Sequence, residues 1–116
     1  MSYNLAFWAD GDDLDPQQTY AALGDGDHVD GVRPIDAAQL EAALTAQLVG
    51  WRRDAHILQP PGADPDGAPA FDVSIGAQLA EFVGYGTTGD HFNAIIDVMG
   101  SLGFRLYDPQ TGERFG

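Results

Sequence analysis

A helix that leads directly into a strand, within residues 89–109, constrains the fold of this chain more than any other stretch. Its apolar residues recur at spacings of three and four, which places them on one face of a helix: Phe92, Ile95, Ile96, Met99 and Leu102. Asp90 can cap the first turn, and Gly103 stands where a left-handed residue ends a helix. Residues 104–107 then alternate as a short strand. This order predicts a sheet with helices packed on one face.

Strand and helix patterns also alternate along the rest of the chain. Strands are predicted over residues 3–9, 55–59, 71–75 and 79–85, and helices over 17–23 and 36–49. The first strand is apolar on both faces, which is typical of a central strand that is covered on both sides, or of a strand that leaves Trp8 at a functional rim. Residues 60–69, PPGADPDGAP, are predicted to form a loop, either functional or a spacer. The order β-α-α-β-β-β-α-β therefore predicts one α+β domain over residues 1–116, with a mostly antiparallel sheet and helices packed on it.

Charge is the strongest compositional signal in the chain. There are 18 acidic residues against 5 arginines, which gives a formal net charge of −13. Residues 1–32 hold seven aspartates and no basic residue. Such a surface repels nucleic acid and anionic membranes, and it favours a basic protein or a cation as partner. A generally acidic composition explains the same charge equally well.

Targeting signals and redox chemistry are predicted to be absent. The chain has no cysteine, which excludes disulfides and thiolate chemistry. Its first residues, MSYNLAFWADGDD, lack the basic and apolar regions of a signal peptide. No stretch approaches the roughly 20 apolar residues of a transmembrane helix. We therefore expect a cytoplasmic protein.

A metal site is not predicted, and neither is a cofactor. His28 lies among Asp25, Asp27 and Asp30, which is the nearest approach to a ligand cluster. The spacing departs from a calcium-binding loop because Val29 occupies a ligand position. The glycine-rich stretch GYGTTG, residues 84–89, lacks the lysine of a phosphate-binding loop.

Catalytic motifs are not recognisable either. The three serines lie outside any G-x-S-x-G elbow. Glu81 lies between apolar neighbours in a predicted strand, where an inward-facing carboxylate would have a raised pKa, although a solvent-facing position fits the alternation better. An alternative function is therefore a small ligand-binding or hydrolytic domain, with a pocket near residues 84–91 and Glu81 and His91 as acid and base.

Three segments resemble a group of small uncharacterised bacterial proteins. They are MSYNLAFW at the start, FDVSIG in the middle, and GFRLYDPQ after the last helix. Together they cover about half of the chain, and residues 10–69 carry no part of the resemblance. Members of the group are often associated with toxin–immunity loci, so the resemblance implies an immunity role by association. Asp108 is the best candidate for a shared polar position, and an Asx-turn at the end of the strand explains it as well.

We therefore expect an immunity protein that neutralises a cognate toxin domain, the toxin being a basic enzyme that targets nucleic acid or nucleotides. An acidic surface would steer such a partner toward the protein and contribute to specificity. The expected contact residues are six aspartates, with one or more of three aromatic residues as candidate anchors. The aspartates are Asp10, Asp12, Asp13, Asp25, Asp27 and Asp30, and the aromatic candidates are Trp8, Trp51 or Tyr85. Whether the two acidic loops meet in space, and which oligomeric state the protein adopts, do not follow from the sequence.

Overall fold

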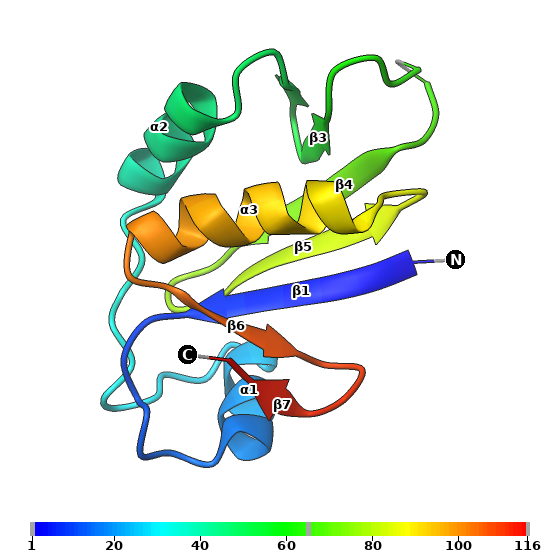
Figure 1. The fold of residues 1–116 in the computed structure, drawn as a ribbon. Helices are drawn as coiled ribbons and strands as arrows, with labels where there is room; N and C mark the ends of the chain where they lie inside the picture. Colours follow the sequence, from blue (N-terminus) through cyan, green and yellow to red (C-terminus); the bar gives the residue numbers. More distant parts are fainter. Residues whose placement is uncertain (1, 65, 116) are drawn as a thin grey trace.

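The computed structural model describes residues 2–64 and 66–115, so Met1, Pro65 and Gly116 lie outside the described residues. Within these ranges the chain forms three helices and one seven-stranded sheet (Figure 1). All neighbouring strands are antiparallel, in the order β2-β3-β4-β5-β1-β6-β7. The predicted α+β class with an antiparallel sheet is confirmed.

The elements have the following bounds. The helices are α1 (Pro16–Gly24), α2 (Ala37–Gln47) and α3 (Gly89–Ser101). The strands are β1 (Ser2–Trp8), β2 (Arg52–Asp54), β3 (Ile57–Gln59), β4 (Ala70–Ile75), β5 (Ala80–Tyr85), β6 (Arg105–Asp108) and β7 (Glu113–Arg114).

Strand β1 lies inside the sheet, between β5 and β6. Alternate side chains of a strand point to opposite faces, so a strand that is covered on both sides is apolar throughout. Leu5 and Phe7 belong to one core cluster, whereas Ala6 and Trp8 belong to the other. The predicted central position of this strand is confirmed.

Helices α2 and α3 pack on the first of these faces. Leu40 and Leu44 of α2 and Ile95 and Met99 of α3 are buried against the phenylalanines of the sheet. Figure 1 shows α3 lying across β4 and β5. This is the larger core, and it uses the apolar face that the spacing in α3 predicts. Gly103 has φ +87° just after α3, as its predicted role requires.

Helix α1 packs on the opposite face, which corrects the expectation that the helices share one face. Leu23 of α1 joins Trp8, Val32, Leu79 and Tyr107 in the second core cluster. The reason lies in β1, because Ala6 and Trp8 present an apolar surface that needs its own cover. The sheet is therefore covered on both faces at the end where β1 leads into residues 10–15.

Element boundaries differ from the prediction at several points. The predicted strand 55–59 begins only at Ile57, because Ala55 has φ +51° in the turn of a hairpin that β2 opens. The short strands β2 and β7 are additional. The N-cap of α3 is Thr88, and Asp90 lies in the first turn instead. Short strands depend on tertiary pairing, which local patterns do not contain, and the ends of helices commonly shift by one or two residues.

The proline-rich loop is braced against β3 by one glutamine. Gln59 is buried, and its side-chain amide donates hydrogen bonds to the carbonyls of Asp64 (2.7 Å) and Gly67 (2.9 Å). Its amide oxygen accepts a hydrogen bond from Arg52 on the neighbouring strand. The described part of this loop is thus tied to the sheet at two points.

Candidate protein-interaction surface

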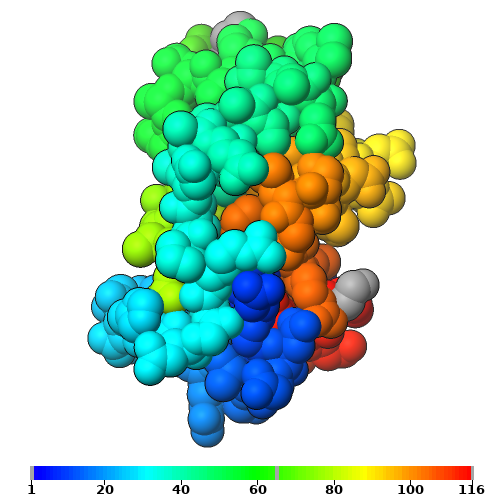
Figure 2. Space-filling model, turned by 90° about the vertical axis from the view of Figure 1, so that its left-hand side faces the viewer, coloured from blue at the N-terminus to red at the C-terminus, as the bar shows by residue number. Residues whose placement is uncertain are grey.

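The two acidic loops, residues 10–15 and 24–31, lie on either side of α1 in sequence and meet in space. Asp10 pairs with Val32 in an isolated antiparallel bridge. The amide of Arg33 donates a 2.9 Å hydrogen bond to the carbonyl of Ala9. Figure 2 shows the blue and cyan segments side by side in the lower part of the molecule. With α1 between them, these loops form one region, which we call the acidic surface.

A buried glutamine holds the second acidic loop in place. Gln78 lies in the turn between β4 and β5, and its side-chain oxygen accepts a 3.0 Å hydrogen bond from the amide of Val29. Its side-chain nitrogen donates to the carbonyls of Val29 (2.9 Å) and Val32 (3.0 Å). Gln78 thus satisfies buried backbone groups that would otherwise be costly. Sequence reasoning missed this residue, since nothing local distinguishes it from an exposed turn residue.

Two of the expected aspartates are compensated by the protein's own arginines. Asp10 forms an ion pair with Arg33 at 3.4 Å. Asp12 pairs with Arg114 at 3.1 Å and also with Arg105. Although both aspartates are exposed, the neighbouring guanidinium groups reduce the field that they present to a partner. These ion pairs tie the first loop to Arg33 and to the last two strands, so Asp10 and Asp12 present less charge to a partner than the other four expected aspartates do.

Four of the six expected aspartates have no arginine partner in the part of the chain that the structure describes. Asp13, Asp25 and Asp27 are exposed and form no ion pair with any other residue in the described ranges. Asp30 is exposed and lies 3.1 Å from the imidazole of His28. Asp15, by contrast, caps α1, because its carboxylate accepts a 2.9 Å hydrogen bond from the amide of Gln18.

Trp8 is not a surface residue, which corrects its expected role as an anchor. Its side chain has 0% exposure. The ring of Tyr107 packs against it at 5.2 Å, and the guanidinium of Arg114 lies 4.6 Å from its ring centroid. These contacts make Trp8 part of the second core. Its burial follows from the cover that α1 and β7 provide, and it agrees with the apolar pattern on both faces of β1.

The other two aromatic candidates lie away from the acidic surface. Trp51 is half-buried and stacks on Phe71 at 6.2 Å, on the face of α2 and α3. Tyr85 is 46% exposed at the end of β5, where it pairs with Ser2. Because β1 runs from Ser2 to Trp8, about 20 Å of strand separates Tyr85 from the acidic loops. The structure therefore does not bring the three aromatic candidates together with the aspartates on one surface.

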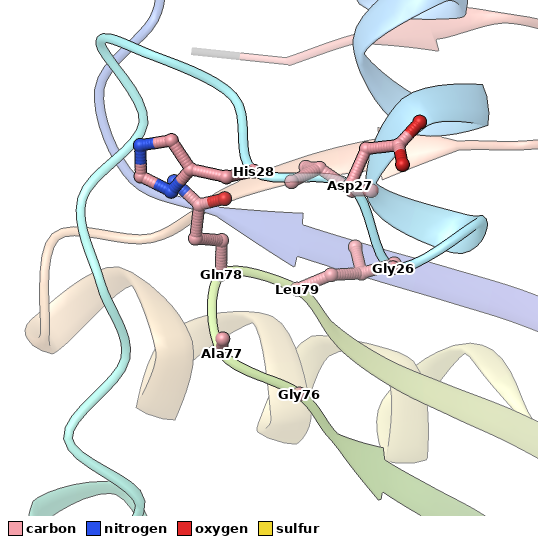
Figure 3. Close-up of a pocket in the computed structure, with 8 residues that line it drawn as sticks. Gly26, Asp27, His28, Gly76, Ala77, Gln78 and Leu79 are labelled. Carbon is pink, nitrogen blue, oxygen red and sulfur yellow. The ribbon is translucent and has the colours of Figure 1, made fainter.

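A hollow of about 220 Å³ opens within the acidic surface (Figure 3). Its walls come from the loop after α1 and from the turn between β4 and β5: Leu23, Gly26, Asp27, His28, Gly76, Ala77, Gln78 and Leu79. Figure 3 shows the His28 ring close to the Gln78 amide, with the Asp27 carboxylate turned away from them. Ligand sites for drug-sized molecules usually have about 300–1,000 Å³, so this hollow suits a smaller group.

The alternative acid–base pair, Glu81 and His91, is wrong. Glu81 points to the face of α1 and accepts a 2.8 Å hydrogen bond from the hydroxyl of Tyr20. His91 lies on the opposite face, where its ring is edge-on to Trp51 and its Nδ1 accepts a hydrogen bond from the amide of Thr88. The sheet separates the two groups. A hollow of about 370 Å³ does open beside residues 84–87, but neither group lines it.

Neither a cluster of metal ligands nor a membrane-spanning helix occurs among the described residues. Among residues 2–64 and 66–115, no group of three histidine, aspartate or glutamate side chains is placed to hold a metal ion. In the same ranges no helix is long and apolar enough to cross a membrane.

No protein-family model matches the chain, and no curated protein sequence matches it.

Proposed function

We propose that this protein is an immunity protein, which binds a cognate bacterial toxin domain and neutralises it. One observation carries the proposal: the two acidic loops meet in a single surface on which Asp13, Asp25, Asp27 and Asp30 have no arginine partner among the described residues. The resemblance of the sequence to proteins of toxin–immunity loci supports the same function. The partner would be a basic enzyme that acts on nucleic acid or nucleotides.

Electrostatics supports this function in preference to a nucleic-acid or membrane role. Enzymes that act on phosphate-bearing substrates commonly carry basic clefts, because they must neutralise phosphate charge. A concentrated acidic surface speeds the encounter with such a cleft and can exclude the substrate from it. The backbone bridge and the Gln78 brace keep the loops ordered before binding, which lowers the entropy lost on association.

Co-expression with the product of the neighbouring gene tests the proposal. We expect that product to arrest growth when it is expressed alone, and we expect co-expression of this protein to restore growth. The two proteins should also co-purify. A neighbouring product that is harmless, or toxicity that this protein leaves unchanged, would contradict the immunity function.

A fourfold Asp→Asn variant tests the surface itself, at positions 13, 25, 27 and 30. We expect its association rate with the toxin at low salt to fall about tenfold or more, and the salt dependence to flatten. The matched control carries the same charge change at the exposed residues Asp64, Asp66, Asp90 and Asp97. If the association rate fell equally in the two variants, net charge, rather than this surface, would drive association.

A further inference from the structure

We infer that the hollow within the acidic surface receives one basic side chain, a lysine or an arginine, from the partner. The inference rests on the proposed function and adds the point of contact to it. The hollow lies between residues 23–28 and residues 76–79, and one of its lining residues is Asp27, which has no arginine partner among the described residues. It would be the place where the partner is held after the charges have brought it close.

The size and the walls of the hollow fit a single long side chain. Leu23 and Leu79 provide apolar walls, and Gly26, Gly76 and Ala77 add little bulk. At Gly26 an added Cβ would meet nothing within 4 Å, so this side of the hollow is open. Lysine and arginine bury their aliphatic stems against apolar surface while the charged group stays near water.

The charge around the mouth selects a cation. Asp27 lies at the rim, and Asp25 and Asp30 belong to the same loop. Figure 3 shows the Asp27 carboxylate directed away from the His28 ring and the Gln78 amide. No arginine lines the hollow among the described residues, and the one basic group at its edge, His28, already pairs with Asp30. A cationic head group that binds here would lie beside a loop that carries three exposed carboxylates, and it would be attracted by their charge.

Both walls are fixed by hydrogen bonds before any partner binds. The amide of Gly76 donates a 2.7 Å bond to the carbonyl of Leu79, and the amide of Ile35 donates a 2.7 Å bond to the carbonyl of Ala77. Gln78 ties the same turn to Val29 and Val32. A pocket of this kind needs little ordering on binding, and buried arginines in such pockets often dominate interface energies.

Filling the hollow without changing any charge tests the inference. Ala77 is exposed and lines the hollow, so Ala77→Trp should occupy it. The matched control is Ala42→Trp, on the exposed face of α2. With the toxin as ligand, we expect Ala77→Trp to dissociate at least about tenfold faster, with an association rate within about twofold of wild type. Ala42→Trp should leave both rates unchanged.

A second pair of variants covers the case in which Ala77→Trp does not fold. Asp27→Asn and Asp13→Asn each remove one charge from the acidic surface, but only Asp27 lines the hollow. We expect Asp27→Asn to accelerate dissociation severalfold more than Asp13→Asn does. If wild type binds the toxin while a folded Ala77→Trp dissociates at the wild-type rate, or the two Asn variants dissociate equally fast, the hollow is not the contact. Failure of wild type to bind would instead overturn the proposed function.

Discussion

The hydroxyl of Tyr20 in α1 donates a 2.8 Å hydrogen bond to Oε2 of Glu81 in β5, across the smaller of the two cores. This bond joins the helix between the acidic loops to an interior strand of the sheet. Burial, followed by the hydrogen bond and the charge of Glu81, raises the pKa of Tyr20. The neutral phenol is therefore the form that the fold selects.

Removing this hydroxyl should destabilise the protein. Tyr20→Phe leaves the half-buried carboxylate of Glu81 without its donor, and we expect a loss of about 1–3 kcal/mol in the free energy of unfolding, measured by urea denaturation. The double variant Tyr20→Phe, Glu81→Leu should recover part of that loss, because no polar group is then left unpaired. Wild-type stability for Tyr20→Phe would show that the bond contributes nothing net.

Asp108 should make stability depend on pH in the acid range. Burial alone would raise the pKa of this carboxyl, but hydrogen bonds from Tyr3 and Gln110 outweigh it and hold the pKa below its ordinary value of 3.8. The hydrogen bond between Tyr3 and Asp108 also raises the pKa of Tyr3. For a lowered pKa, the stabilisation is complete above the ordinary value and is lost as the pH falls through the value in the folded protein.

We therefore expect the urea concentration at the unfolding midpoint of wild type to decrease as the pH is lowered below about 4. In Asp108→Asn the midpoint should depend less on pH in that range. At pH 7 the same variant should lose about 1–3 kcal/mol of stability. Asp97→Asn, at an exposed position of α3, is the control and should behave like wild type. If wild type and Asp108→Asn had parallel pH profiles, other carboxyls would account for the acid sensitivity.

Arg114 should contribute to stability through its guanidinium shape as well as its charge. Its side chain is 6% exposed, lies over the ring of Trp8, and donates hydrogen bonds to the Trp8 carbonyl (2.9 Å) and to Asp12 (3.1 Å). Burial, together with the charge of Arg105, lowers its pKa despite the nearby aspartates. We expect Arg114→Ala to cost about 2–4 kcal/mol in urea denaturation.

Arg114→Lys separates these two contributions. Lysine keeps the charge but cannot span the carbonyl and the carboxylate with a planar fork, so we expect it to restore less than half of the loss. Recovery of full stability with lysine would mean that charge alone is sufficient at this position.

Gly84 and Gly100 should respond in opposite directions to alanine. At Gly84 an added Cβ would lie 2.3 Å from Oγ1 of Thr87 and 3.0 Å from the ring of Phe71, whereas at Gly100 it would meet nothing within 4 Å. We expect Gly84→Ala to lower the free energy of unfolding by about 1–3 kcal/mol through overpacking. Gly100→Ala, in helix α3, should raise it by about 0.5–1 kcal/mol. A neutral Gly84→Ala would show that Thr87 can move aside.

Much of the fold was predictable because its signals are local. The spacing in α3, the positive φ at Gly103 and the two-sided apolar pattern of β1 each follow from the residues themselves. Strands β2 and β7 escaped prediction because strands of two or three residues exist only through their pairing partners. The face of the sheet on which α1 packs also depends on tertiary contacts, since the local sequence allows α1 to pack on either face.

The site was less predictable than the fold, because exposure is a tertiary property. A tryptophan at the end of an apolar strand fits a core or a rim, and only the cover from α1 and Arg114 places Trp8 in the core. Similarly, Asp10 and Asp12 look like Asp25 and Asp27 in sequence. Only Asp10 and Asp12 have arginine partners among the described residues, and these partners, Arg33, Arg105 and Arg114, are distant in sequence. Glu81 faces α1 because the register of β5 with β1 fixes its side.

The position of the Gln78 brace has a consequence for how this protein could change over time. Gln78 holds the second acidic loop through backbone atoms of Val29 and Val32, so the loop's shape does not depend on the identity of its exposed side chains. Asp25, Asp27 and Asp30 can therefore be exchanged for other residues with little penalty for folding. A lineage could follow a changing partner by substitutions on this loop alone, while the sheet and both cores stay as they are.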